Sequence, residues 1–446
     1  MGYRVAHIGA FDMENLGDLL FSDVVAAHLT ERLDIDEIVY FSPQSCTIPN
    51  TDKETHSVAQ LESFHLDKPF DAIIVGGGDM VHLWKVRMNL PHISDDWILY
   101  DVLHMWVIPS LVASQYGIPL VWNAPGVPVD FVDTDNDIVN VLCQAVDYIS
   151  VRDNQAKKVL STAVPPQEIT VVPDSVLTID RFFPQEELAE SLEARNLTHL
   201  KPGEYIFFQA TVRFSDEQLR QSVEALQKIK KETGLAVLVQ SIGYSMGDEE
   251  VCERIVEMSG GEFETLDGHP TQMDLLALLA NAAFYIGGSL HGSIISSAYG
   301  VKNVTCNVFN YNKIEGFLEL MSNSEACLHD MADVYEAFWR QKEAPQPPLL
   351  QELKGRVEKH FDAIASIISR GTKRVDENYP LRIADYIHAS SARMEALRTD
   401  VRNLQEEVER LTAEKSALQG GLDELHASTS WKVTAPLRRI VSAVRK

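Results

Sequence analysis

The N-terminal part of the chain alternates short apolar runs with longer amphipathic segments. Residues 3–10 (YRVAHIGA) and 37–41 (EIVYF) have the apolar content of strands, and residues 18–33 between them repeat apolar positions on one helical face. This spacing is that of a βαβ unit, which requires a parallel sheet with helices on its faces. Further strands are predicted at residues 72–75, 119–122, 148–151 and 169–172. We therefore expect an N-terminal α/β domain over residues 1–190.

The same alternation restarts after a charged connector near residues 185–204. A helix is predicted over residues 216–233, and strands are predicted at 205–209, 235–240, 283–288 and 303–308. These elements indicate a second α/β domain over residues 200–343. One strand in each half ends in glycines, at 76–78 and at 287–288. Because the carboxyl ends of parallel strands line the ligand crevice of open α/β sheets, we expect a cleft between the two domains.

The C-terminal part has a different pattern. Residues 344–348 (APQPP) read as a linker, because proline fixes φ and removes backbone donors. The following segment, 349–372, is predicted to be a helix that packs on the globular part through apolar residues at intervals of three to four: Leu353, Val357, Phe361, Ile364 and Ile368.

From Met394 onward the apolar positions alternate at spacings of three and four, interrupted only by Lys415. This is the seam of a coiled coil, so we expect residues 385–427 to drive self-association. A single long helix lying on the body is the alternative. Residues 428–446 then reverse the charge of the chain, with no acidic residue and the cations Lys432, Arg438, Arg439, Arg445 and Lys446. With Trp431 among them, they form a basic amphipathic tail.

Composition narrows the classes of function. The 446 residues are 45% apolar and 23% charged, with a formal net charge of −26. This charge would repel a phosphate backbone, so no nucleic-acid partner is expected. The five cysteines show no metal-ligand spacing, which predicts no structural metal site and a reducing compartment. The absence of a signal-like segment or an 18-residue apolar run predicts a cytoplasmic protein.

Two candidate binding segments follow strands of the first domain. Asn15, Gly17 and Asp18 precede the first helix, where backbone N–H groups and the helix dipole favour an anion; a simple turn with an N-cap is the alternative. Gly77 and Gly78 allow close backbone approach to a ligand, and Asp79 beside them is a candidate base. A tight turn without a ligand explains these glycines equally well.

The next residues are rich in aromatic and basic side chains: His82, Trp84, Lys85, Arg87, Trp97 and Trp106. Trp84 and Trp97 are candidates for stacking on a sugar face, although tryptophan is more often a packing residue.

The sharpest candidate site is in the second domain. Ser289, Leu290, His291 and Gly292 follow a buried strand and precede a helix expected from Ser293 to Tyr299. A histidine in this position is suited to anion binding or to proton transfer near neutral pH, and a hydrogen-bonded structural histidine is the alternative. Arg152 and Arg213, each after a predicted strand, are candidates to bind a carboxylate or a phosphate, or else surface ion-pair residues.

Seven short motifs, taken in order, resemble the polysaccharide pyruvyltransferase family. They are NLGD (15–18), DAIIVGGGDM (71–80), NAPGVP (123–128), SVRDNQA (150–156), VVPDSVL (171–177), SLHGSIISSAYGV (289–301) and FNYNKIEGF (309–317). The resemblance implies two Rossmann-like domains facing a cleft, in a glycosyltransferase-B-like α/β fold. It also implies transfer of the enolpyruvyl unit of phosphoenolpyruvate onto two hydroxyls of a sugar of a bacterial surface glycan or lipid-linked acceptor, as a cyclic ketal.

The resemblance also suggests roles for single residues. His291 matches the histidine of the family's Leu-His motif, which contacts phosphoenolpyruvate. Many members carry arginine where this chain has Ser289, so Arg213, Arg152 or Lys313 would have to hold the donor. Ketal formation needs an acid, for which His291 is the candidate, and a base, for which Asp79 or Asp18 is the candidate. No cofactor is expected.

Two other functions stay open at this point. A nucleotide-sugar glycosyltransferase could use the same architecture, although no carboxylate for the ribose can be placed in the sequence. A catalytically silent scaffold in polysaccharide assembly is the second, supported by Ser289 and by the coiled-coil seam. The segment SWKVTAPLRR (430–439) is similar to an element that ends many bacterial surface-polysaccharide enzymes, and such a tail would suit contact with the inner face of the cell membrane.

Overall fold

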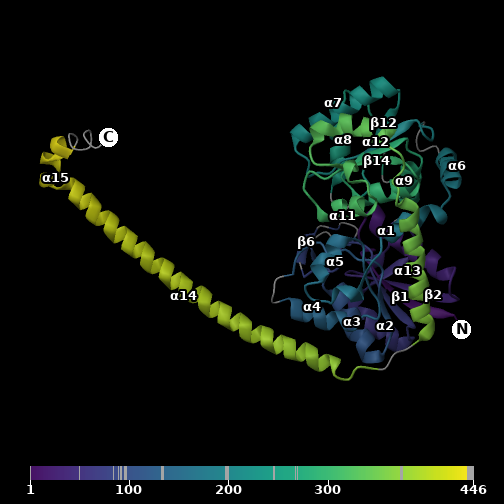
Figure 1. Ribbon diagram of the computed structural model, residues 1–446, viewed down its shortest axis with the longest axis horizontal. Coiled ribbons are helices and arrows are strands. Elements are labelled where there is room, and N and C mark those ends of the chain that lie inside the picture. Colours follow the sequence, from purple (N-terminus) through teal and green to yellow (C-terminus); the bar gives the residue numbers. More distant parts are fainter. Residues whose placement is uncertain are drawn as a thin grey trace. The chain divides into compact units, whose positions relative to one another are not determined.

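The computed structural model describes residues 2–49, 51–83, 85–88, 90, 93–94, 98–131, 135–195, 200–244, 247–266, 268, 270–371 and 375–438. The chain forms two compact units, Met1–Pro380 and Leu381–Lys446. The first unit contains two α/β lobes (Figure 1). Trp84, Trp97 and the tail residues from Arg439 lie outside the described residues.

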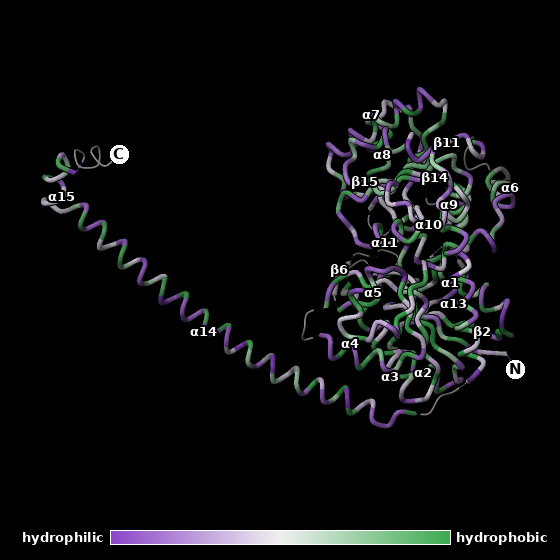
Figure 2. Tube along the Cα trace, in the orientation of Figure 1, coloured by the Kyte–Doolittle hydropathy of each residue, from purple (hydrophilic) through white to green (hydrophobic). Residues whose placement is uncertain are grey.

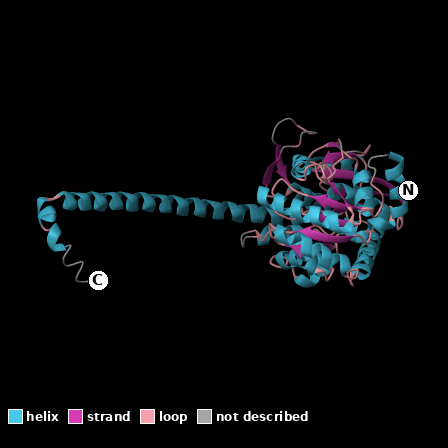
Figure 3. Cartoon of the chain, turned by 90° about the horizontal axis from the view of Figure 1, so that it is seen from above, coloured by secondary structure: helices cyan, strands magenta, loops and turns pink. Residues whose placement is uncertain are grey.

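The N-terminal lobe is a mainly parallel sheet covered by helices (Figures 1 and 3). Its six-stranded sheet has the order β3-β4-β2-β1-β5-β8, with only β3 antiparallel to its neighbour. The elements are β1 (Tyr3–Ile8), α1 (Leu16–Thr30), β2 (Ile35–Ser42), β3 (Cys46–Thr47), β4 (Glu54–Ser57), α2 (Leu61–Asp67), β5 (Ala72–Val75), α3 (His104–Tyr116) and β8 (Leu120–Trp122). The hairpin β6 (Lys85–Met88) and β7 (Ile98–Asp101) lies between β5 and α3 in the chain.

Four more elements complete this lobe: α4 (Asn136–Cys143), β9 (Ile149–Val151), α5 (Asn154–Leu160) and β10 (Ile169–Val171). β9 pairs with β10 and also reaches β8 through a bridge between Val121 and Tyr148. The central strand β5 is a continuous apolar run and β1 is almost entirely buried, as expected for strands covered on both faces. The chain leaves the lobe through the 3-10 helix η3 (Ser175–Arg181).

The C-terminal lobe repeats this architecture around a five-stranded parallel sheet of order β12-β11-β13-β14-β15. Its elements are α6 (Gln185–Arg195), β11 (Tyr205–Gln209), α7 (Asp216–Thr233), β12 (Ala236–Val239), α8 (Asp248–Met258), α9 (Gln272–Ala280), β13 (Phe284–Gly287), α10 (Leu290–Ala298), β14 (Lys302–Cys306), α11 (Asn312–Leu320), β15 (Cys327–Leu328) and α12 (Val334–Glu343). The segment expected as a charged connector thus contains a helix, α6, which packs against α9. The predicted helix at 293–299 begins earlier, at Leu290.

The two lobes share a hydrophobic core. Leu20 and Phe21 of α1, Val176 of η3 and Ile294 of α10 belong to one cluster of buried side chains. Backbone hydrogen bonds also join the lobes, from the Leu16 amide to the Ile242 carbonyl at 2.9 Å and from the Tyr244 amide to the Glu14 carbonyl at 2.7 Å. The lobes therefore meet along a continuous packed interface beside the ends of their strands.

Helix α13 (Leu350–Arg370) follows the proline-rich linker and packs on the N-terminal lobe. All five residues expected to face the body are buried: Leu353, Val357, Phe361, Ile364 and Ile368. His360 on the same helix accepts or donates hydrogen bonds at 3.1 Å to Asn123 and at 3.2 Å to Tyr148. The chain therefore returns to its first lobe after completing the second.

The second unit consists of α14, which begins at Tyr379 and runs to Ala427, followed by the short α15 (Thr429–Val433). The fold predicted from the sequence, two α/β lobes followed by a long C-terminal helix, is confirmed, whereas pairing of that helix stays a prediction. Within the described residues, no helix is both long enough and apolar enough to cross a bilayer.

Candidate active site between the lobes

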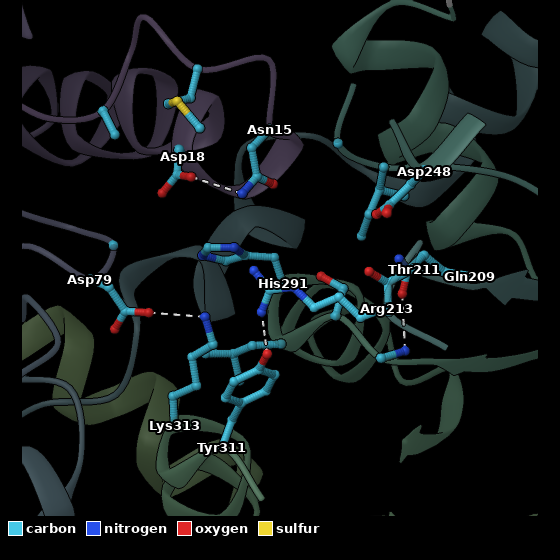
Figure 4. A pocket seen from close by; sticks show the side chains of 18 of the residues that line it. Asn15, Asp18, Asp79, Gln209, Thr211, Arg213, Asp248, His291, Tyr311 and Lys313 are labelled. Atoms are coloured by element: carbon cyan, nitrogen blue, oxygen red, sulfur yellow. Dashed lines mark hydrogen bonds and ion pairs between the residues drawn. The ribbon is translucent and has the colours of Figure 1, made fainter. Parts of the chain in front are cut away.

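A cavity of about 420 Å³ opens between the carboxyl ends of the two sheets. Ten of the thirteen residues predicted to form the site line it: Asn15, Asp18, Gly78, Asp79, Arg152, Arg213, Ser289, Leu290, His291 and Lys313. Five of them, up to Arg152, come from the N-terminal lobe, and the other five come from the C-terminal lobe (Figure 4). The interdomain cleft expected from the paired glycine-ended strands is therefore present.

Asp18 lies in the first turn of α1, where the helix dipole favours a negative charge. Its Oδ2 accepts a hydrogen bond of 2.8 Å from the Asn15 amide group. Burial raises the pKa of Asp18, and the neighbouring carboxylates of Asp79 and Asp174 add to this shift. His291 and Lys313 act in the opposite direction. A carboxyl with a raised pKa can give or take a proton closer to neutral pH than an ordinary aspartate.

The glycines after β5 serve two different purposes. Gly78 lines the cavity with a φ of +76°, and a Cβ there would come within 2.7 Å of an Asp18 oxygen. Gly77 does not line the cavity, because it lies against the ring of Phe21, 2.1 Å from where its own Cβ would be. Of these two glycines, only Gly78 therefore lines the cavity.

Asp79 forms ion pairs with two cations, one from each lobe. Arg152, which is only 5% exposed, donates to Oδ1, and the Lys313 ammonium lies 2.9 Å from Oδ2. Burial alone would raise the pKa of Asp79, but Arg152 and Lys313 outweigh burial and hold the pKa well below its usual range. A carboxylate held this strongly in its charged form is a poor proton acceptor, so the structure argues against Asp79 as the base.

Arg213 follows β11 and faces the cavity from the C-terminal lobe (Figure 4). Its side chain is exposed, and its guanidinium donates a hydrogen bond to the hydroxyl of Tyr311. Tyr311 in turn lies 5.7 Å from the Lys313 ammonium, measured to the ring centroid. The two cations are thus placed on either side of one tyrosine, with Arg213 open to a ligand.

His291 lies in the first turn of α10, and its residue is only 8% exposed. Its Nε2 lies 3.6 Å from Oδ2 of Asp174, and its ring meets the edge of Phe21 at 5.7 Å between centroids. Ser289 caps the helix, since its hydroxyl accepts a hydrogen bond of 3.4 Å from the Gly292 amide. Ser289 therefore helps to hold the helical turn that carries His291.

Gly17 and Gly292 lie outside the cavity lining but adjoin its residues. A Cβ on Gly17 would come within 1.9 Å of the His291 ring, and one on Gly292 would come within 2.2 Å of the Tyr285 hydroxyl. Gly17 therefore leaves room for the His291 ring and Gly292 leaves room for Tyr285, and neither residue lines the cavity as predicted.

Sequence reasoning assigned no role to Asp174, which the structure places beside His291. Asp174 is 3% exposed, and its Oδ1 accepts a hydrogen bond of 3.0 Å from the Val176 amide at the start of η3. The motif VVPDSVL (171–177) contains this residue, and a proline–aspartate pair before a turn was the available signal. The remaining unpredicted cavity residues include Gln209, Asp248 and Tyr311.

Two further carboxyl groups near the cavity have shifted pKa values. Burial raises the pKa of Asp248, although the Val212 amide donates to it at 2.9 Å. Burial raises the pKa of Asp12 to about 7, and the hydroxyl of Tyr100 donates to that carboxyl at 2.7 Å. Tyr100 itself lines the cavity, so the Asp12 carboxyl lies directly behind a residue that lines it.

Of the six aromatic and basic residues singled out after β5, the structure describes the side chains of His82 and Trp106. Trp106 is fully buried and donates to the His82 carbonyl at 3.4 Å, so it is a core residue. Trp84 and Trp97 are outside the described residues, as are the side chains of Lys85 and Arg87. No cluster of three metal-ligating side chains occurs in the part of the chain that the structure describes.

Comparison with solved structures identifies the fold class. The chain resembles UDP-N-acetylglucosamine 2-epimerases from Methanocaldococcus jannaschii (TM-score 0.53, 12% identity, 81% of this chain and 99% of that one), Neisseria meningitidis (0.52, 9%, 82% and 99%) and Rickettsia bellii (0.51, 12%, 83% and 98%). At these identities the likeness shows the fold alone, the two-lobed glycosyltransferase-B fold with a ligand cleft between its lobes.

Comparison of the sequence with protein-family models shows the family to which the chain belongs. The model of the polysaccharide pyruvyl transferase family matches residues 15–310, which span all the motifs that line the cavity up to β14. The chain belongs to this family of transferases. No curated protein matches it.

Proposed function

We propose that this protein transfers the pyruvyl unit of phosphoenolpyruvate to a sugar of a bacterial surface glycan, forming a pyruvate ketal. The observation that carries the proposal is the gathering of three cations and an acid–base pair in one interlobe cavity of a strongly acidic chain: Arg152, Arg213 and Lys313 with Asp18 and His291. The cavity volume of about 420 Å³ falls within the usual range of small-ligand sites, about 300–1,000 Å³.

The donor carries a carboxylate and a phosphate, so it requires several positive groups in a protein that otherwise repels anions. Arg213 has an exposed guanidinium facing the cavity, and Lys313 is 36% exposed beside it. Arg152 is buried and paired with Asp79, so its role is to position Asp79. Arg213 and Lys313 thus take the place of the arginine that Ser289 replaces, and the amide groups at the start of α10 add partial positive charge.

The chemistry needs one group to supply a proton and another to remove protons. Protonation of the donor's terminal carbon converts it to a methyl group and makes the adjacent carbon electrophilic. The first sugar hydroxyl adds there and loses its proton; the bond to phosphate then breaks, and the second hydroxyl adds and loses its proton. Of the two protons lost by the sugar hydroxyls, one restores the proton that the acid gave to the methyl group. The other leaves bound to the released phosphate.

We attribute these transfers to His291 and Asp18. Asp174 lies beside the ring of His291, 3.6 Å from its Nε2, while Asp18 has a raised pKa and lies in the opposing lobe of the cavity. We assign His291 as the acid or phosphate-binding group and Asp18 as the base. Asp79 organises the cations and takes no part in proton transfer.

The test is phosphate release by the full chain given phosphoenolpyruvate and candidate glycans, with the ketal methyl group detected by NMR. His291→Ala should lower turnover at least about 100-fold, the scale of losing a positioned acid or base. His291→Asn should be nearly as inactive if the ring transfers a proton and more active if it contacts phosphate. Reaction with a nucleotide-sugar in place of phosphoenolpyruvate would refute the proposal in favour of a glycosyltransferase.

The basic tail supports a location at the inner face of the cell membrane, where lipid-linked acceptors are assembled. Trp431 stacks with the guanidinium of Arg438, 3.6 Å from the ring centroid, and Val433 and Leu437 are exposed beside them. Cations next to exposed apolar groups suit an anionic lipid surface. Co-sedimentation with vesicles containing anionic lipid, compared with neutral vesicles, tests this contact.

A further inference from the structure

The apolar seam of α14 is open to water along its whole described length. Its side chains have exposed fractions between 48% and 67%. In Figure 2 it appears as green segments that recur between purple ones along the helix. The seam consists of Ile387, Leu397, Val401, Leu404, Val408, Leu411, Leu418, Leu422 and Leu425. An apolar stripe of this length is unfavourable in water unless a partner covers it.

The heptad register of the seam separates its residues into two kinds. Every d position from 397 to 425 is leucine, whereas the a positions are Val401, Val408, Lys415 and Leu422. β-branched residues at a combined with leucine at d favour two-stranded, parallel coiled coils over higher assemblies. Lys415 occupies one a position, and a single lysine there fixes register and strand number at some cost in stability. In a pair of helices its ammonium can extend past the seam into water.

The flanking charges distinguish the two possible directions. The g positions from 400 to 414 carry Asp400, Glu407 and Glu414, and the e positions that they meet in a parallel pair are the uncharged Gln405, Thr412 and Gln419. One heptad earlier, a parallel pair sets Arg393 against Arg398. An antiparallel pair centred near Glu407 packs g against g, which sets the three acids against one another. Because these acids outnumber the single pair of arginines, the parallel orientation is favoured.

Two glycines lie near the end of α14. Gly420 and Gly421 lie within the helix, and a Cβ on either would meet no other atom within 4 Å. Each glycine costs about 1 kcal/mol relative to alanine in a helix interior. Packing of the neighbouring seam residues Leu418 and Leu422 against a second helix would offset this cost.

We infer that α14 pairs with α14 of a second copy as a parallel, in-register, two-stranded coiled coil from residue 387 to residue 425. This arrangement brings residues 428–446 of both copies to the same end of the coil. Two basic tails at one end bind an anionic surface more tightly than one, because the second contact becomes intramolecular.

Mass measurement of the full chain tests the number of strands. Light scattering should give about twice the chain mass of 49.9 kDa at micromolar concentration. The double substitution V401D and V408D should give the monomer mass with unchanged melting of the first unit, since α14 is a separate unit. A monomeric or trimeric wild-type chain overturns the inference, as does a dimer that persists in the double variant.

Cross-linking tests direction and register. The first unit contains all five native cysteines, so a cysteine in α14 reports only on the coil. L397C and L418C, each alone, should form a disulfide with the same position of the second copy under mild oxidation. A413C, at the outward f position, is the matched control and should remain unlinked. Failure of both d-position variants to link to themselves refutes the parallel, in-register pair.

Discussion

Gly17 of the N-terminal lobe lies directly against the imidazole of His291 in the C-terminal lobe. A Cβ on Gly17 would come within 1.9 Å of both Cγ and Nδ1 of that ring. The two residues are far apart in sequence, and they meet because the start of α1 is hydrogen-bonded across the interface to the backbone at Ile242. The NLGD turn (15–18) therefore packs against the ring of His291 and restricts its position.

Replacing Gly17 by alanine should displace the ring and reduce turnover by about 100-fold, the cost of a misplacement of about 1 Å. Helix propensity alone would stabilise α1 by about 1 kcal/mol, so a loss of activity cannot come from a weaker helix. Gly355→Ala in α13 is the matched control, because a Cβ there meets nothing within 4 Å. That variant should gain stability and keep full activity. Equal activity of both variants would refute the contact.

Asp174 should act on the rate through His291. Asp174→Asn keeps an oxygen that can cap η3 at the Val176 amide but removes the charge 3.6 Å from His291 Nε2. We expect kcat to fall about 10–100-fold, within the range for general acid–base catalysis, while KM for phosphoenolpyruvate stays within about twofold. Asp330→Asn, which alters the same kind of cap at Ala332 outside the cavity, is the control. A change confined to melting temperature would assign Asp174 a purely structural role.

Much of this site was predictable because its chemistry lies at strand ends. The buried strands are nearly continuous apolar runs, and the glycine-rich turns after β5 and β13 marked the edge of each sheet where the cavity is found. The predicted helix 216–233 coincides with α7, which begins with a capping box at Ser215 and Gln218. The short strands β3 and β15 have only two residues each and carry no periodic signal.

The rest of the site depends on contacts between lobes, which no local pattern contains. From its position at a strand end, Asp79 was predicted to be a base. Only the structure shows that it forms an ion pair with Lys313 of the other lobe, which lowers its pKa. Asp174 and His291 likewise come together only when the lobes meet. Helix α10 begins at Leu290, ahead of the predicted Ser293, because Ser289 caps it.

Arg213 should determine donor affinity. Its exposed guanidinium faces the cavity and is held by the hydroxyl of Tyr311. A charge-assisted hydrogen bond contributes about 1.5–3 kcal/mol, so Arg213→Ala should raise KM for phosphoenolpyruvate about 10–100-fold and change kcat by less than about fivefold. Arg254→Ala, which removes an exposed ion pair with Asp216 away from the cavity, is the control. Identical kinetics of the two variants would exclude Arg213 from the donor site.

His360 should make the first unit sensitive to acid. Its ring is 2% exposed between α13 and the N-terminal lobe, with Asn123 and Tyr148 as hydrogen-bond partners. Burial lowers the pKa of His360 from 6.5 to about 3, and the neighbouring His28 lowers it further. Below pH 6.5 the imidazole of His360 therefore binds a proton in the unfolded chain but stays neutral in the folded chain. The free energy of unfolding consequently falls as the pH falls from 6.5 toward 3.

For one such group the loss between pH 7 and pH 5 is about 2 kcal/mol, from 1.36 kcal/mol per pH unit below the unfolded pKa. His360→Gln cannot titrate, so its free energy of unfolding in urea should fall by about 2 kcal/mol less than that of the wild type over this interval. His329→Gln, at an exposed position, should retain the wild-type slope.

The comparison between variants is needed because other groups titrate in the same interval. His28 has a pKa lowered by burial to about 3, and Asp12 opposes it with a raised pKa of about 7. If His360→Gln and the wild type lose stability equally on acidification, the imidazole is not held neutral between α13 and the first lobe.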